Sequence, residues 1–189
     1  LQICEDLWDN NYNCKVSTMQ KELGADILIN ISASPFHKDR LVKRRSIIEE
    51  KVKSLNIPFL YCNMVGAQDE LIFDGQSIGL SESGNLIAYG NPFEEEVILV
   101  NTDRKKELEV NFQSREEKTY NALCLGVKDY FYKTGHKEAV IGLSGGIDSA
   151  LVAAIATEAL GRDKVHGVSL PSKYSSDHSL KDAEDLTNT

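Results

Sequence analysis

The sequence predicts an α/β fold in two parts, of which the second is the start of a doubly wound parallel sheet. Short apolar runs of strand type alternate with helical segments through the first hundred residues, which is typical of a layered α/β unit. After a charged stretch without a clear period, a glycine turn joins one strand-like run to a helix, and a second such run follows. We therefore place domains at residues 1–100 and 114–189, joined by a linker at residues 101–113.

The elements of the first part follow from the period of their apolar residues. Residues 41–55 carry apolar side chains at helical spacing among many charges, which predicts an amphipathic helix. Residues 82–85 supply the turn of a β-hairpin. The expected strands are residues 1–4, 25–31, 59–65, 77–81, 86–89 and 96–100.

The second part opens with a helix start signal. Ser114 followed three residues later by Glu117 is a capping box, which predicts a helix to about Lys133. The apolar run at residues 138–143 predicts a buried strand, and residues 165–170 predict a second strand of the same parallel type. Two further signals are a helix end at Gly161 and an N-cap at Ser175 or Ser176.

The turn after residues 138–143 is the most informative motif. It consists of Ser144, Gly145, Gly146, Ile147, Asp148 and Ser149. A strand–glycine–helix turn directs backbone N–H groups and the positive end of the helix dipole at one point, which suits a phosphate group. A Walker A loop is excluded because no Lys-Ser/Thr pair follows the last glycine. The alternative is a strand–helix turn that is glycine-rich by chance.

Composition limits the class of protein. With 41% hydrophobic and 26% charged residues the chain is ordinary globular material, and no apolar run approaches the ~20 residues that span a bilayer. The net charge of −8 argues against non-specific nucleic-acid binding. The four cysteines match no CxxC spacing and the four histidines form no cluster, so we expect a cytoplasmic protein with reduced thiols and no membrane partner.

Cys4 is a second candidate for chemistry. It directly follows the first strand-like run, and a cysteine on a tight turn at a strand end is well placed as a nucleophile with backbone N–H groups as an oxyanion hole. The alternative is an inert buried cysteine, which is common in globular proteins.

Both candidates gain weight from a resemblance to known families. The glycine loop resembles the SGGxDS loop of the N-type ATP pyrophosphatases, and the part from about Ser114 resembles the synthetase domain of NAD synthetase. The first part resembles the C-terminal half of the nitrilase-type amidase domain. The segments that carry these likenesses are Cys4-Glu5-Asp6, residues 30–36, Asn63, Gly66, residues 68–70, residues 73–77, residues 170–176 and Asp182-Ala183. In this order, the two parts resemble the glutamine-dependent NAD synthetases.

The resemblance implies a partial nitrilase-like α-β-β-α sandwich followed by the start of the pyrophosphatase domain. It also implies that Cys4 hydrolyses glutamine, with Ser34 and Arg40 holding the substrate and the Glu5 backbone N–H helping to bind the oxyanion. For Arg40 the alternative stays open, because the basic run Lys38, Arg40, Lys43, Arg44 and Arg45 is also typical of a solvated helix face.

At the glycine loop, the resemblance implies that ATP adenylates nicotinic acid adenine dinucleotide and that ammonia displaces AMP to give NAD. Asp148 is the candidate Mg²⁺ ligand, or else an acid that complements the helix dipole. Lys173, Tyr174 and Ser175 lie near the carboxyl edge of the sheet, without assigned roles. The family also implies a homo-oligomer.

Two other functions stay open. One is a related N-type pyrophosphatase amidotransferase with a different acceptor, and the other is a non-catalytic assembly module. The family's catalytic glutamate and lysine lie upstream of the nucleophile, so we expect the chain to be an internal piece that has no glutaminase activity alone.

Overall fold

The computed structural model describes residues 1–171 and 177–187, and it divides into two compact units. Unit 1 comprises Leu1–Gly66 and Glu70–Ala122, and unit 2 comprises Ala67–Asp69 and Leu123–Thr189. The division falls inside helix α3 (Arg115–Thr134). Residues 101–113 belong to unit 1, where the Leu108 amide donates to the Leu86 carbonyl at 2.8 Å and Leu108 packs on the core. A domain division at 101–113 stays a prediction.

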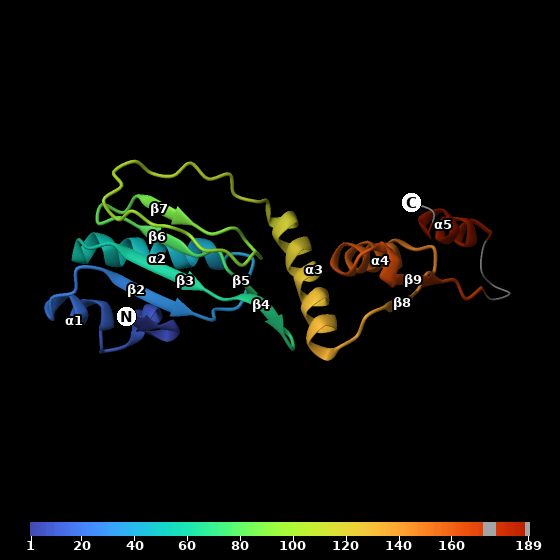
Figure 1. Cartoon of the computed structure of the whole chain (residues 1–189), viewed down its shortest axis with the longest axis horizontal. Coiled ribbons are helices and arrows are strands. Elements are labelled where there is room, and N and C mark those ends of the chain that lie inside the picture. Colours follow the sequence, from blue (N-terminus) through green and yellow to red (C-terminus); the bar gives the residue numbers. More distant parts are fainter. Residues whose placement is uncertain (172–176, 188–189) are drawn as a thin grey trace. The chain divides into compact units, whose positions relative to one another are not determined.

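Unit 1 is built on a five-stranded mixed sheet (Figure 1), so its α/β class is confirmed. Its strands, in spatial order, are β1 (Gln2–Ile3), β2 (Leu28–Ser32), β3 (Phe59–Asn63), β6 (Ile78–Leu80) and β7 (Leu86–Tyr89). The first three run parallel, and the β6–β7 hairpin continues the sheet in antiparallel pairing. Because parallel strands end at the same edge, the residues that follow β1, β2 and β3 are neighbours.

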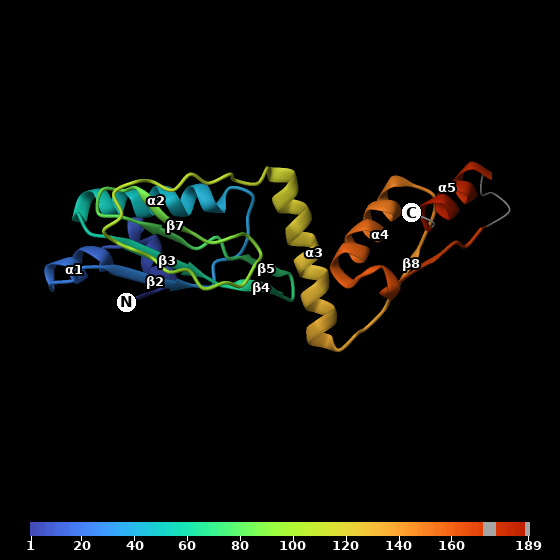
Figure 2. The same ribbon diagram turned by 45° about the horizontal axis from the view of Figure 1, so that its top comes forward.

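Two helices cover one face of this sheet (Figure 2): α1 (Val16–Glu22) and α2 (Arg40–Leu55). The amphipathic helix predicted at 41–55 is therefore confirmed. Alternate strand residues point toward the helices and form one core, together with the inner face of α2. Its fully buried members include Leu28, Ile48, Phe59, Tyr61 and Leu80. Burying each such side chain contributes about 1.5–3 kcal/mol.

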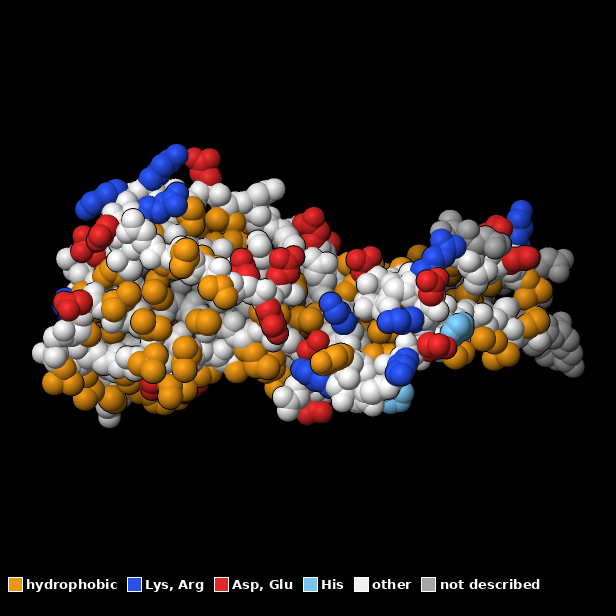
Figure 3. Space-filling view, viewed as in Figure 1, with side chains coloured by type: hydrophobic (Ala, Val, Ile, Leu, Met, Phe, Trp, Pro, Cys, Tyr) orange, Lys and Arg blue, Asp and Glu red, His pale blue; other side chains and the backbone are white. Residues whose placement is uncertain are grey.

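The opposite face of the sheet is apolar and exposed. Hydrophobic side chains gather over unit 1 in the space-filling view (Figure 3). On β1 and β2 and directly after β3, the side chains of Ile3, Ile29, Ile31 and Met64 are 36 to 65% exposed. This alternation of buried and exposed apolar residues shows why the strands carry apolar residues at nearly every position.

The strand predicted at residues 96–100 is wrong, because Glu96–Val100 forms no strand. Its apolar run is typical of a strand, but the segment has no ladder partner, and Val97 and Leu99 are 94% and 96% exposed. A small separate hairpin, β4 (Val65–Gln68) and β5 (Leu71–Asp74), was not predicted.

Unit 2 contains the predicted strand–helix–strand order. Its elements after α3 are β8 (Ala139–Gly142), α4 (Ile147–Leu160), the 3₁₀ turn η2 (Arg162–Lys164), β9 (Val165–Val168) and α5 (Asp177–Thr187). The capping box of α3 forms, with the Ser114 amide donating to Glu117 Oε2 at 2.6 Å and the Glu117 amide donating to Ser114 Oγ at 3.1 Å. Residues 172–176 lie outside the described residues, and with them the predicted cap at Ser175 or Ser176 and the candidates Lys173 and Tyr174.

Strands β8 and β9 pair in parallel, with Ala139 opposite Val165. Residues 139–142 form the predicted strand, but the prediction that it is buried is wrong. Val140 is 72% exposed, because along β8 the more covered residues alternate with exposed ones. In the described part of the chain, no helix is both long and apolar enough to cross a membrane.

Candidate active sites

The first candidate site lies at the carboxyl edge of the parallel strands in unit 1. Cys4 directly follows β1, and Ser34 follows β2 by two residues. A pocket of about 610 Å³ is lined by both residues and by Arg40 at the start of α2. The structure therefore brings together the three residues that the sequence suggested for glutamine chemistry.

Cys4 occupies a strained turn. Its φ of +39° lies in the left-handed region, which a residue with a Cβ rarely adopts and which costs of order 1–3 kcal/mol. The Cys4 carbonyl accepts a hydrogen bond from the side chain of fully buried Asn30, at 3.5 Å. Cys4 also begins the 3₁₀ helix η1 (Cys4–Asn11), whose first N–H groups have no acceptor within the helix. Backbone N–H groups that suit an oxyanion therefore follow Cys4 directly in the chain.

Arg40 is anchored beside this turn by an aromatic ring. Its guanidinium carbon lies 5.3 Å from the centroid of the Trp8 ring, and Lys43 Nζ lies 5.6 Å from the same ring. Arg40 Nε is buried and has no hydrogen-bond partner among the residues that the structure describes. Arg40 is therefore not a freely solvated charge, which favours a role in the pocket over the alternative of a solvated helix start.

The residues of the basic run at 38–45 differ in their exposure to solvent. Arg44 is 0% exposed and forms a bidentate ion pair with Asp74, so this member of the run does not face water. A helical period explains the difference, since Arg44 lies one turn before Ile48 on the buried face of α2. An arginine at a core position of an amphipathic helix was the sequence signal that could have revealed it.

Tyr89 borders the buried polar cluster around Asp74. Burial, assisted by the Asp74 charge, raises the pKa of Tyr89 to about 12, so its hydroxyl stays protonated and lies 3.4 Å from Gln76 Oε1. The folded state then holds this proton between pH 10 and 12, where the unfolded chain releases it. We expect the free energy of unfolding to fall as the pH rises through this range.

This slope is measured by urea unfolding between pH 8 and 11.5. The Tyr89→Phe variant should lose stability less steeply above pH 10 than the parent protein. Parallel curves for the two proteins would contradict the prediction.

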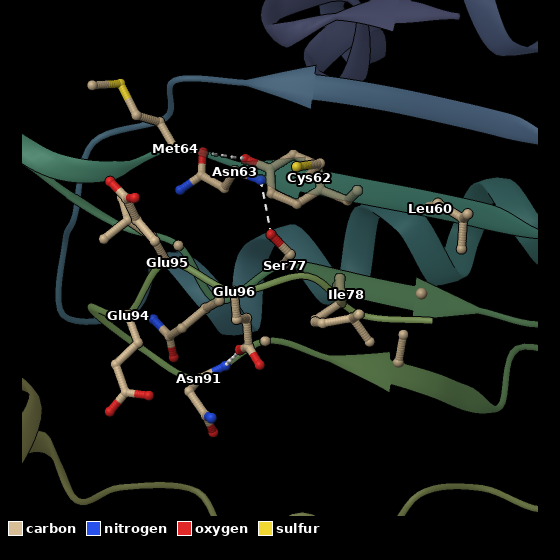
Figure 4. A pocket seen from close by; sticks show the side chains of 18 of the residues that line it. Leu60, Cys62, Asn63, Met64, Ser77, Ile78, Asn91, Glu94, Glu95 and Glu96 are labelled. Carbon is tan, nitrogen blue, oxygen red and sulfur yellow. Dashed lines mark hydrogen bonds between the residues drawn. The ribbon is translucent and has the colours of Figure 1, made fainter. Parts of the chain in front are cut away.

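A second pocket, of about 490 Å³, lies on the exposed face of the sheet (Figure 4). Its lining includes Cys62 and the acidic run Glu94–Glu96, and no lysine, arginine or histidine. A cysteine nucleophile is usually accompanied by a histidine or another cationic group, and this lining supplies none. We therefore do not assign chemistry to this pocket.

The third feature is the glycine loop between β8 and α4. Ser149 Oγ donates to the Gly146 carbonyl at 2.9 Å and lies 3.2 Å from Ser144 Oγ, and the Gly146 amide donates to Ser144 Oγ at 3.3 Å. The two serines thus hold the loop closed at the N-terminus of a 14-residue helix. The first amides of α4 point where an anion is favoured.

Gly145 is required by the loop backbone. Its φ is +76°, and a Cβ at this position would lie 2.2 Å from the carbonyl oxygen of Ser179 in α5. Neither the conformation nor the space admits another residue.

Asp148 lies exposed in the first turn of α4. It has a position suited either to a metal ion or to the helix dipole. Among the described residues, no group of three or more His, Cys, Asp or Glu side chains could hold a metal ion.

Comparison with known proteins finds one matching family model and several similar enzymes. Residues 119–189 match the family described as NAD synthase. The chain is 39% identical to the glutamine-dependent NAD(+) synthetase of Thermotoga maritima, over 97% of this chain and 38% of that protein. It is 40% identical to the enzyme of the same name from Synechocystis, over 96% of this chain and 35% of that protein.

The fold agrees with this similarity. The structure of glutamine-dependent NAD+ synthetase from Acinetobacter baumannii, described as a complex with ADP, matches with a TM-score of 0.88 and 33% identity, over 96% of this chain and 35% of that one. The chain spans little more than a third of the length of these relatives. Over nearly all of its own length, this chain is thus a relative of the glutamine-dependent NAD(+) synthetases in both sequence and fold.

Proposed function

We propose that the full-length protein containing this chain is a glutamine-hydrolysing NAD synthetase, a carbon–nitrogen ligase. The observation that carries the proposal is the presence, on one chain, of a strained cysteine in a pocket with Ser34 and Arg40 and of a glycine loop at the N-terminus of a 14-residue helix. The similarity to synthetases of this name supports it. Because the chain spans little more than a third of those relatives, the reaction belongs to the full-length protein.

In the first reaction, the sulfur of Cys4 attacks the side-chain carbonyl carbon of glutamine. The C–N bond breaks, the thiol proton leaves on the departing ammonia, and a thioester remains on Cys4. Water then cleaves the thioester to glutamate and the free thiol. The backbone amides at the start of η1, including that of Glu5, would hold the oxyanion.

Ser34 and Arg40 would bind the amino-acid end of glutamine. The Arg40 guanidinium suits the α-carboxylate, because a planar fork of N–H donors can bind two carboxylate oxygens. Trp8 keeps the guanidinium at the pocket wall, so less side-chain freedom is lost when the substrate binds.

In the second reaction, the carboxylate of nicotinic acid adenine dinucleotide attacks the α-phosphate of ATP and releases pyrophosphate. Ammonia then displaces AMP from the acyl adenylate to form the amide of NAD. Residues 144–149 would bind the phosphates through backbone N–H groups and serine hydroxyls. That a related synthetase is described as an ADP complex is consistent with an adenine nucleotide here.

We also propose that Mg²⁺ accompanies ATP, with Asp148 as its protein ligand, since a carboxylate beside polyphosphate is favourable only with a cation between them. The four free cysteines support a reducing, cytoplasmic location. A homo-oligomer is proposed from the family resemblance.

The test is NAD formation by the full-length protein, supplied with ATP, Mg²⁺, nicotinic acid adenine dinucleotide and either glutamine or ammonium. We expect NAD and AMP in equal amounts from both nitrogen sources. If neither source yields NAD while ATP is still cleaved, the acceptor is wrong.

Arg40→Gln should raise the KM for glutamine by about 10- to 100-fold, because a charge-assisted hydrogen bond contributes about 1.5–3 kcal/mol. The ammonium-dependent rate should not change. Lys38→Gln, an exposed neighbour outside the pocket lining, is the matched control. An unchanged KM in the Arg40 variant would remove Arg40 from the glutamine site.

A further inference from the structure

We infer that Arg44, Asp74 and Asn63 form a positioning device that holds the Ser34 loop in the shape needed to bind glutamine. The inference rests on the proposed function of the Cys4 pocket. It concerns residues that neither line the pocket nor touch the nucleophile, with Arg44 on α2, Asp74 at the end of β5 and Asn63 at the end of β3.

Arg44 connects an ion pair to the pocket backbone. Its Nη1 and Nη2 donate to the two carboxylate oxygens of Asp74 at 3.1 and 2.9 Å, and Nη2 also donates to the Ser34 carbonyl at 2.7 Å. Both charged side chains are 0% exposed. The shortest of the three bonds is therefore the one that reaches the pocket loop.

The side-chain amide of Asn63 binds both backbone polar groups of Ser34. Its Oδ1 accepts the Ser34 amide at 2.9 Å, and its Nδ2 donates to the Ser34 carbonyl at 3.2 Å. Nδ2 also lies 3.3 Å from Asp74 Oδ1. The two backbone polar groups of Ser34 are thus bound by side chains that meet at one carboxylate.

The Asp74 carboxylate is the hub of this cluster. It accepts from Arg44, from Asn63 and from Gln76 Nε2. The left-handed conformation of Gly75 and Gln76, with φ of +61° and +51°, turns the chain back so that Gln76 faces the carboxylate. With its lone pairs occupied, Asp74 has no freedom to turn, and the loop it supports is fixed with it.

Stability alone is a weak explanation for this arrangement. A buried ion pair is often no more stabilising than apolar residues of similar volume, because the desolvation penalty offsets the attraction. Arg44 Nε is also buried without a partner among the described residues, which is unfavourable. The cluster instead fixes the orientation of a pocket residue, since the Arg44 guanidinium and the Asn63 amide both bind the backbone of Ser34.

The test uses Arg44→Lys in the full-length protein. Lysine keeps the charge opposite Asp74 but lacks the planar fork that reaches Asp74 and Ser34 together. We expect the KM for glutamine to rise about tenfold or more while the ammonium-dependent rate of NAD formation stays unchanged. Arg45→Lys is the matched control, because the neighbouring Arg45 pairs with Glu49 and Glu107 at the surface.

Covalent labelling of Cys4 separates substrate positioning from thiol chemistry. In Arg44→Lys, a diazoketone analogue of glutamine should label Cys4 about tenfold more slowly, whereas iodoacetamide should label it at the parental rate. Equal slowing by both reagents, or parental KM and labelling rates, would overturn the inference. Because Arg44→Lys could fail to fold, Asn63→Ala is measured beside it. This variant keeps both charges and should show the same pattern, and a parental KM in it would equally overturn the inference.

Measurements on the parent protein distinguish a failure of the proposed function from a failure of the positioning role. If it makes no NAD from glutamine and the analogue does not label Cys4, the proposed function fails. If the parent is active and labelled but the variants match it, only the positioning role fails.

Discussion

Replacing Cys4 by alanine is expected to lower glutamine-dependent NAD formation by at least about 10³-fold in the full-length protein, because a nucleophile acts as a unit with the rest of its site. NAD formation from ammonium should continue at the parental rate, since the glycine loop belongs to a different unit. The measurement compares the two nitrogen sources in the same enzyme preparation. Alanine also carries a Cβ and so keeps the backbone strain at this position, which means that the variant removes the thiol alone.

Cys62→Ala is the matched control for this variant. Cys62 is also a free cysteine, and it lies exposed on the far face of the sheet beside the acidic residues 94–96. It should leave both activities unchanged. Glutamine-dependent activity that survives in Cys4→Ala and disappears in Cys62→Ala would move the nucleophile to the other pocket.

Replacing Gly145 by alanine is expected to reduce NAD formation from both nitrogen sources by about 100-fold or more. The new Cβ would meet the Ser179 carbonyl at 2.2 Å, so the loop or α5 must move. A displacement of about 1 Å of the groups that bind a substrate is enough for a loss of this size. The effect should appear as weaker ATP binding, measured by calorimetry, as well as a lower rate.

Gly135→Ala separates the clash from backbone strain. Gly135 has a similar φ of +78°, but a Cβ there meets no atom within 4 Å. Its replacement therefore adds the conformational cost alone, of about 1 kcal/mol. If both variants keep parental ATP affinity, the loop does not bind the nucleotide.

Local sequence signals predicted the elements that depend on neighbouring residues. The capping box at Ser114 and Glu117 starts α3, the apolar period of residues 41–55 forms α2, and the glycines after β8 open the turn into α4. Each of these signals acts within a few residues along the chain. The local sequence therefore contains the information that sets where these helices form.

Residues 96–100 show a limit of prediction from such local signals. Their apolar run is as strand-like as that of β2, yet a strand also needs a partner with free backbone groups, which this segment does not find. Pairing depends on the rest of the fold and not on the segment. The same limit applies to Val140, whose exposure depends on what covers β8.

By itself, the sequence determined the α/β class, the starts of α3 and α4, and the glycine loop, because glycine, capping and apolar spacing act locally. Only the tertiary structure decided that Arg44 is buried and that Asn63 and Asp74 meet beneath Ser34. These residues come from separate elements, and Arg44 and Asp74 are 30 positions apart in the chain. The helical period places Arg44 on the inner face of α2, but its buried charge also needs an acceptor, and the local pattern of α2 does not show that Asp74 supplies one.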